Sequence, residues 1–286
     1  GMELALGLDR NTWYDLYQRN PIERFAEQYW KENGIDGWEE YKTIPDRLYI
    51  GNAFCHLLFP KEEQLFALME KAIVENVEIT LVFPCMREVQ VEERGKLLKK
   101  VDNWCEKRQT RVEILVNDWG MTALVKKSGK HLEPCLGVLL NKQKKDPRMR
   151  YKKGSTRGLG ENNLQADFYR RFLKDRYGIN RYEWESCGYP QVFPQGKNSL
   201  HLPYYQTNTS QYCPLYASCT VGERGKQQLP ESCPGYCEQY AYIYPEHLHM
   251  AGRYNSLFGL DEELVEHPEQ LKVYQQAGID RLVIGL

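Results

Sequence analysis

The stretch VEITLVF at residues 77–83 is apolar and rich in β-branched side chains, and Pro84 ends it. Two similar runs follow, VEILV at 112–116 and CLGVLL at 135–140. Between them, apolar residues recur at helical spacing through residues 92–107, and a shorter helix is expected to pass through Leu124. Strands that alternate with helices in this way predict βα units and a parallel sheet.

The same alternation extends to both ends of the sequence. Further strands are expected at 2–8, 47–51, 179–185, 199–203 and 281–285, and further helices at 21–32, from Pro60 through Ile73, at 163–177 and at 261–277, the last broken at Pro268. Eight strands is the number of a closed (β/α)₈ barrel. We therefore predict an α/β fold, a TIM-barrel-like single domain over residues 1–286 whose first and last strands pair. A doubly wound open sheet is the alternative. Because no GxGxxG motif follows the first strand, the dinucleotide-binding version of that fold is not expected.

Net charge and the length of the apolar runs argue against two classes of protein, those that bind nucleic acid through an overall basic charge and those that span a membrane. The net charge is −1, which gives the whole molecule no basic field of the kind that attracts nucleic acid. No apolar run approaches the roughly 18 residues of a transmembrane helix, and the apolar segment 2–8 is shorter than a signal peptide. We therefore expect a cytoplasmic protein with no membrane span.

Four of the nine cysteines fall within 25 residues, inside a cysteine-rich loop expected at 204–245; they are Cys213, Cys219, Cys233 and Cys237. Thiolates are soft ligands, and four of them suit Zn²⁺ or an iron–sulfur cluster. The alternatives are a pair of disulfides or four unrelated thiols, and a reducing cytoplasm favours metal over disulfide. The spacing is not that of a standard zinc ribbon.

Polar side chains follow most of the predicted strands. We take Arg87, Asn117, Asp118, Asn141 and Glu185 as candidates for a cavity; Asn52, His56, Glu88, Glu183 and His201 occupy similar positions. The carboxyl ends of parallel strands meet at one end of a barrel, where active sites lie. Two structural alternatives stay open: Asp118 could cap the helix that follows it, and the alternating charges from Arg181 to Glu185 could form an internal ion pair.

A basic loop insertion is expected at 142–162, where KQKKDPRMRYKKGSTR (142–157) carries eight Lys or Arg and one Asp. It could be a solvated surface loop. It could also hold an anion beside the site, such as a carboxylate, a phosphate or an RNA backbone. No nucleophile elbow, HExxH or P-loop motif is present.

Several motifs, taken in order, resemble a known family. They are RLYIG (47–51) followed by Cys55, VEILVNDWG (112–120), GVLLNKQKKDP (137–147), the cysteine-rich loop, and GIDRLVIGL (278–286). In this order they are similar to the collagenase-like U32 peptidase family. The similarity is greatest to its small single-domain members that act in oxygen-independent ubiquinone hydroxylation.

This resemblance implies a cofactor and a function. It implies a [4Fe–4S] cluster held by Cys219, Cys233 and Cys237; the fourth ligand is Cys55 by the resemblance, or Cys213 by spacing. It implies an enzyme or electron-handling subunit in an oxygen-independent hydroxylation, acting on a small molecule or RNA, with a possible partner subunit of the same family. The alternatives are a U32-type peptidase or hydrolase, or a non-catalytic binding barrel, with structural zinc in place of the cluster.

Overall fold

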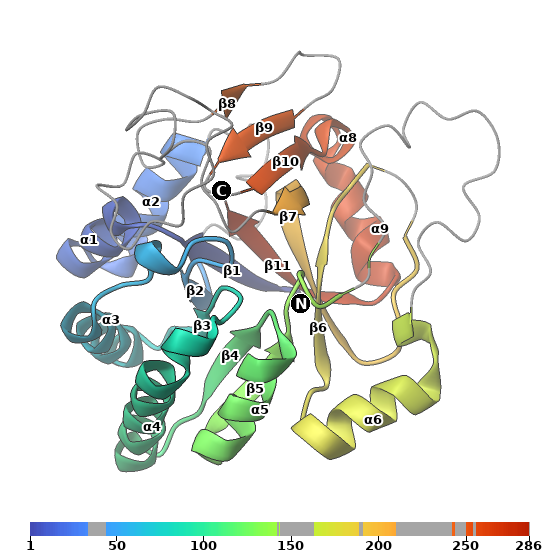
Figure 1. Cartoon of the computed structure of the whole chain (residues 1–286). Coiled ribbons are helices and arrows are strands. Elements are labelled where there is room, and N and C mark those ends of the chain that lie inside the picture. The colour runs from blue at the N-terminus through green and yellow to red at the C-terminus, as the bar shows by residue number, and fades with distance from the viewer. Residues whose placement is uncertain are drawn as a thin grey trace.

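The computed structural model describes residues 1–33, 44–141, 143, 163–188, 191–209, 242–243, 250–253 and 256–285. Within these residues eight parallel strands close into a barrel in the order β11-β1-β2-β3-β4-β5-β6-β7, and β7 pairs back onto β11 (Figure 1). The barrel strands are β1 (Glu3–Leu8), β2 (Arg47–Gly51), β3 (Glu78–Val82), β4 (Val112–Val116), β5 (Leu132–Leu136), β6 (Arg181–Glu185), β7 (Lys197–Thr209) and β11 (Ile279–Gly285). The prediction of a TIM-barrel-like α/β fold is confirmed.

Helices surround the barrel (Figure 1). They are α1 (Asn11–Arg19), α2 (Ile22–Asn33), α3 (Glu62–Val74), α4 (Val91–Arg108), α5 (Trp119–Ser128), α6 (Asp167–Tyr177), α8 (Glu262–Glu266) and α9 (Leu271–Gln276), with short 3₁₀ turns η2 (His56–Leu58), η3 (Glu88–Gln90), η5 (Asn163–Gln165) and η8 (Pro268–Gln270). Alternate strand residues, such as Leu4, Leu6 and Leu8 of β1, pack in the core between strands and helices. The residues between them face the barrel interior, because side chains alternate along a strand.

The two ends of the chain close the barrel as predicted. Glu3 pairs with Arg281 and Ala5 with Val283, so β1 and β11 are parallel neighbours.

Strand β2 ends at Gly51, whose backbone φ is +124°, and a Cβ there would lie 2.1 Å from the carbonyl oxygen of Val82. Glycine is therefore required where the chain leaves the barrel towards the carboxyl-terminal loops.

Several elements differ from the sequence prediction. The fifth strand is Leu132–Leu136 and not 135–140, because Val112 of β4 pairs with Leu132 and the chain turns after Gly137. The helix α1 was not predicted at all. Its buried face is aromatic and not aliphatic, consisting of Trp13, Tyr14 and Tyr17, and the polar residues between them hide the helical period.

Strand β7 continues beyond the predicted 199–203 and leaves the barrel at its carboxyl-terminal end. There it pairs antiparallel with β10 (Ser256–Leu260), which pairs with β9 (Met250–Arg253) and then β8 (Tyr242–Ile243), as Figure 1 shows. Most of the cysteine-rich loop predicted at 204–245 lies between β7 and β8. Its cysteines Cys213, Cys219, Cys233 and Cys237 lie outside the described residues, as does the basic loop 142–162 except Gln143.

Candidate active site

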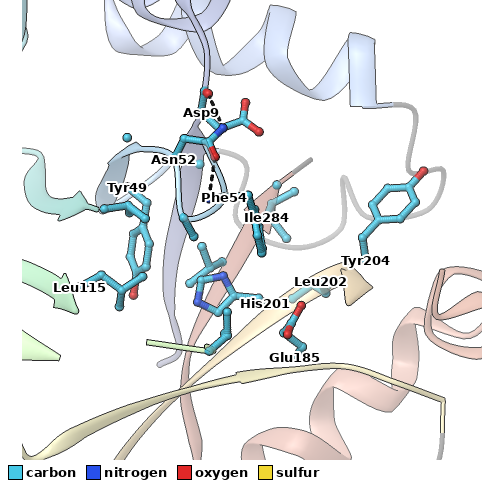
Figure 2. A pocket seen from close by; sticks show the side chains of 17 residues that line it. Asp9, Tyr49, Asn52, Phe54, Leu115, Glu185, His201, Leu202, Tyr204 and Ile284 are labelled. Carbon is cyan, nitrogen blue, oxygen red and sulfur yellow. Dashed lines mark hydrogen bonds between the residues drawn. The ribbon is translucent and has the colours of Figure 1, made fainter. Parts of the chain in front are cut away.

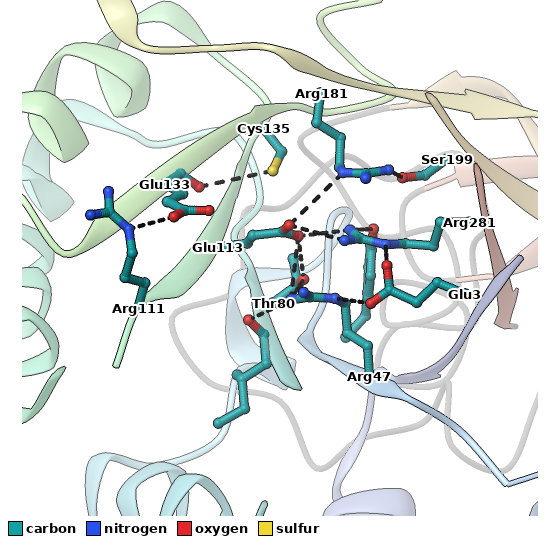
Figure 3. Close-up of polar contacts among 12 residues, drawn as sticks. Glu3, Arg47, Thr80, Arg111, Glu113, Glu133, Cys135, Arg181, Ser199 and Arg281 are labelled. Atoms are coloured by element: carbon teal, nitrogen blue, oxygen red, sulfur yellow. Dashed lines mark hydrogen bonds and ion pairs between the residues drawn. The ribbon is translucent and has the colours of Figure 1, made fainter. Parts of the chain in front are cut away.

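A buried ion-pair network fills the amino-terminal part of the barrel interior (Figure 3). Glu113 of β4 lies at its centre, where two nitrogens of Arg281 donate to its carboxylate oxygens at 2.7 and 3.0 Å. Arg47 and Arg181, each the first residue of its strand, lie 3.5 and 3.8 Å from the same carboxylate. Glu3 accepts from both Arg47 and Arg281 at 2.8 Å. The charges at this end of the barrel are therefore paired with one another.

The network keeps Glu113 ionised. Burial alone would raise the pKa of this carboxyl group, but hydrogen bonds from Arg281 and Thr80 and the charges of Arg47 and Arg281 outweigh burial and lower the pKa. The Arg281 side chain is 2 % exposed. A charge buried this deeply is tolerated only when it is paired and hydrogen-bonded, so this end of the interior is a structural layer.

A second set of polar side chains lies next to this layer, nearer the carboxyl-terminal ends of the strands. Tyr49 of β2 donates from its hydroxyl to Oε1 of Glu183 at 2.5 Å, and Nε2 of His201 lies 3.1 Å from the same oxygen. Arg281 donates to the Tyr49 hydroxyl at 2.9 Å, which links the two layers. Strands β6 and β7 are neighbours, and their register brings Glu183 and His201 to the same side of the interior.

The Glu183 carboxylate is ionised at neutral pH although it is completely buried. Burial would raise its pKa, but the hydrogen bond from His201 and the charges of His201, Arg281 and Arg181 lower the pKa to about 2. Its second oxygen, Oε2, has no hydrogen-bond partner among the described residues. Burial and the Glu183 charge raise the pKa of Tyr49 well above its ordinary value, so the phenol remains the donor.

The Glu183→Gln change should therefore alter the pH dependence of stability. The folded-state pKa of Glu183 lies below its ordinary value of 4.5, so its charge stabilises the fold above that value, and this stabilisation is lost as the pH falls towards about 2. We expect Glu183→Gln to lower the free energy of unfolding by about 3 kcal/mol at pH 7 and by almost nothing near pH 2. Urea unfolding across this range measures both values.

The matched control is Glu133→Gln, which removes a half-exposed carboxylate paired with Arg111. Its effect should stay below about 1 kcal/mol at every pH. If Glu183→Gln lowered the free energy of unfolding by the same amount at pH 7 and at pH 2.5, the assignment of Glu183 as an ionised buried carboxylate would be contradicted.

A cavity of about 120 Å³ opens where the barrel strands end (Figure 2). Its walls are mainly apolar, and its polar lining consists of a few side chains that converge on the cavity. Lining side chains include Asp9, Tyr49, Asn52, Phe54, Val82, Leu115, Val138, Glu185, His201, Leu202, Tyr204, Val283 and Ile284. In Figure 2, His201 lies among these side chains, with Glu185 on one side and Asn52 and Asp9 on the other. Small-molecule sites in TIM barrels have this position and this mixture of walls.

The loop after β2 is fixed by a side-chain turn. Asn52 accepts from the backbone N–H groups of Phe54 and Cys55, both at 2.8 Å, and donates to the backbone oxygen of Asp9 at 3.0 Å. Asn52 is 2 % exposed. It therefore ties the first two strand ends together and presents Phe54 and Asp9 to the cavity.

The predicted site residues separate into two groups. Glu185 lines the cavity. The others serve the loops around it: Asn117 donates to the backbone of Phe83 at 2.7 Å, Asn141 donates to the Glu183 carbonyl at 2.8 Å, and Arg87 lies 3.4 Å from Nε2 of His56. Asp118 caps α5 by accepting from the N–H of Met121 at 2.7 Å, as the structural alternative proposed.

Cys55 is the one predicted metal ligand that falls within the described residues. It is half-buried and follows β2 on the same side of the barrel as the cavity. Across the described part of the chain, no cluster of three or more His, Cys, Asp or Glu side chains has the geometry of a metal site. The other proposed ligands lie in the segment that begins after Thr209.

Sequence reasoning missed Tyr49, Asp9 and the Arg281 network. A signal for Tyr49 was present, because Arg47, Tyr49 and Gly51 alternate with the apolar Leu48 and Ile50. In a barrel strand covered by helices, that alternation places the polar set inside. No comparable local signal marks Asp9, since its position depends on Asn52, which lies 43 residues further along the chain.

No family model matches the sequence, and no curated protein matches it. One solved structure, the spore cortex-lytic enzyme SleL of Bacillus megaterium QM B1551, aligns over 99% of this chain and 70% of its own, with 10% identity and a TM-score of 0.32. A likeness this distant supports no functional argument. None of the helices in the described residues is long and apolar enough to cross a membrane.

Proposed function

We propose that this protein is a barrel enzyme that binds a small molecule in the cavity at the carboxyl-terminal ends of the strands and uses His201 to transfer a proton. One observation carries the proposal: the wall of the cavity contains a histidine that is hydrogen-bonded to a completely buried, ionised carboxylate. A histidine oriented by a carboxylate is a recurrent arrangement for general acid–base catalysis.

The contacts assign a role to each member of the group. Because Glu183 is ionised, its Oε1 accepts hydrogen bonds from Tyr49 and from Nε2–H of His201. In the neutral imidazole this hydrogen bond places the proton on Nε2 and leaves Nδ1 as the acceptor, and Nδ1 has no hydrogen-bond partner among the described residues. Nδ1 takes a proton from the substrate, and Glu183 stabilises the imidazolium that results. Tyr49 and Arg281 position Glu183.

The resemblance to the U32 family supports a more specific proposal, an oxygen-independent hydroxylation. In it, Cys219, Cys233 and Cys237, with Cys55 or Cys213, would hold a [4Fe–4S] cluster. The position of Cys55 on the cavity side of the barrel fits such a cluster near the substrate. When bound, the cluster would supply electron transfer. Proton transfer and substrate binding would remain the work of His201 and the cavity walls.

The remaining parts of this proposal follow from the resemblance and the composition. The protein would act in the cytoplasm, with a possible partner subunit of the same family, on a small molecule or an RNA base. The competing proposal keeps the cysteines as a closed structural zinc site, in a U32-type peptidase or hydrolase or in a non-catalytic binding barrel. Iron, sulfide and zinc analysis of the purified protein separates these possibilities.

Binding of a small neutral ring compound tests the site without knowledge of the substrate. We expect benzyl alcohol to bind with a dissociation constant on the order of 1 mM, which is typical for a fragment of this size. Gly285→Leu should weaken this binding at least about tenfold. Gly285 lines the cavity, and a Cβ there would have no atom of the described residues within 4 Å, so the new side chain would occupy space in the cavity. Ligand-detected NMR titration measures both constants.

The graded control is Gly285→Ala, which adds one methyl group and should retain most of the binding. Thermal unfolding of both variants checks that the fold is intact. Equal binding of benzyl alcohol to the wild-type protein and to folded Gly285→Leu would show that the ring binds elsewhere, and it would remove the support for the proposed site.

A further inference from the structure

An open cleft of about 650 Å³ lies beside the amino-terminal ends of β6 and β7, at the opposite end of the barrel from the candidate active site. One wall is α6, which contributes Asp167, Arg170, Arg171 and Lys174, and this spacing places the four side chains on one face of the helix. The other wall is formed by the chain next to the two strand starts and includes Lys197. The volume is within the range of small-molecule sites.

The charged side chains that line this cleft are mostly positive. Arg170 forms an ion pair with Asp167, so the charges of these two residues largely cancel. Arg171, Lys174 and Lys197 form no ion pair with any described residue, and all three are exposed. Positive charges that share one cleft repel one another, and an anion bound between them relieves that repulsion.

Neutral residues complete the lining of the cleft. The side-chain amides of Asn180 and Gln195 have no hydrogen-bond partner among the described residues, so both can donate to a ligand. Tyr182 also lines the cleft and is 3 % exposed. Gly196 has a φ of +123°, and a Cβ there would lie 3.2 Å from Cε2 of Tyr182, so glycine lets the chain pass close to the ring. The cleft therefore combines cationic and neutral hydrogen-bond donors on a packed surface.

We propose that this cleft binds a small phosphorylated anion, a phosphate ester or a diphosphate, through Arg171, Lys174 and Lys197. Guanidinium and ammonium groups form strong, charge-assisted hydrogen bonds to phosphate oxygens. A phosphate group carries more than one negative charge near neutral pH, which suits several unpaired cations better than a single carboxylate does. The inference is independent of the proposed function, because the cleft and the candidate active site lie at opposite ends of the barrel.

Inorganic pyrophosphate, titrated by calorimetry at low salt, is the probe for this site. We expect it to bind with a dissociation constant on the order of 0.1 mM, and succinate, which carries two carboxylates in place of phosphate, to bind at least about fivefold more weakly. The double variant Arg171→Gln and Lys174→Gln should weaken pyrophosphate binding at least about tenfold, and Lys197→Gln alone at least about threefold, because each change removes positive charge from one wall of the cleft.

The control is the double variant Lys99→Gln and Lys107→Gln, which removes two exposed positive charges from α4, outside the cleft. It should bind pyrophosphate within about twofold of the wild type, because solvent and salt screen distant charges. Thermal unfolding checks that every variant is folded. The proposal is overturned if pyrophosphate does not bind, if the cleft variants bind it as well as the wild type, if the α4 variant loses as much binding as they do, or if succinate binds more tightly than pyrophosphate.

Discussion

Replacing Arg281 by methionine is expected to lower the free energy of unfolding by about 3–5 kcal/mol, the cost of breaking a buried charge pair on one side. The guanidinium contacts Glu113, Glu3 and the hydroxyl of Tyr49 at 2.7 to 3.0 Å. Methionine fills similar space but removes one of the two guanidinium groups that Glu3 and Glu113 share, and leaves Arg47 alone beside both carboxylates. Urea unfolding followed by circular dichroism measures the loss.

The matched control is Lys96→Met, which breaks an exposed ion pair with Glu92 on α4. Its effect should be below about 0.5 kcal/mol, because solvent screens exposed pairs and the side chains remain mobile. If Arg281→Met were as mild as Lys96→Met, the polar interior would not be a structural layer, and its charges would need a functional explanation.

If the proposed metal site is present, replacing both Cys233 and Cys237 by serine is expected to remove its metal completely. Each cysteine would contribute a thiolate, and serine does not ionise near neutral pH. Protein purified without oxygen should be brown and contain iron and sulfide if the site is an iron–sulfur cluster, whereas a structural zinc site gives colourless protein that contains zinc. Iron, sulfide and zinc analysis of both proteins measures the change.

Cys105→Ser is the control for this change. Cys105 is buried on α4, and burial raises the pKa of its thiol to about 12, so it is an inert packing residue whose loss should leave metal content unchanged. Comparison of Cys55→Ser with Cys213→Ser then assigns the fourth ligand. Full iron and sulfide in the Cys233 and Cys237 double variant would contradict the cysteine-cluster proposal.

The barrel was predictable because its strands are short, apolar and separated by helices at regular intervals. The order of strands, the parallel pairing and the closure through residues 2–8 and 281–285 all follow from that alternation. Where the spacing of apolar residues is less regular, the buried face of a helix was harder to predict. Leu164, Phe168 and Phe172 are spaced four apart, yet Phe168 is 72 % exposed and Leu173 is the buried residue of α6, because a 3₁₀ turn at Asn163–Gln165 precedes the helix and shifts its phase.

The site was only partly predictable from the sequence. The rule that polar strand ends gather at one mouth places Glu185, His201 and Asn52 correctly at the cavity. It cannot separate a side chain that faces the cavity from one that holds a loop, as Asn117 and Asp118 do. That difference depends on contacts between residues far apart in the sequence. The buried Glu183 carboxylate depends on Tyr49, His201 and Arg281 in the same way.

The most direct test of the proposed site is a crystal structure of the protein co-crystallised with benzyl alcohol. The account predicts density for the ring in the cavity between the apolar walls of Leu115 and Val283, with the hydroxyl group about 3 Å from Nδ1 of His201. Density for the ring elsewhere on the protein, with none in the cavity, would contradict the assignment of this cavity as the site of chemistry.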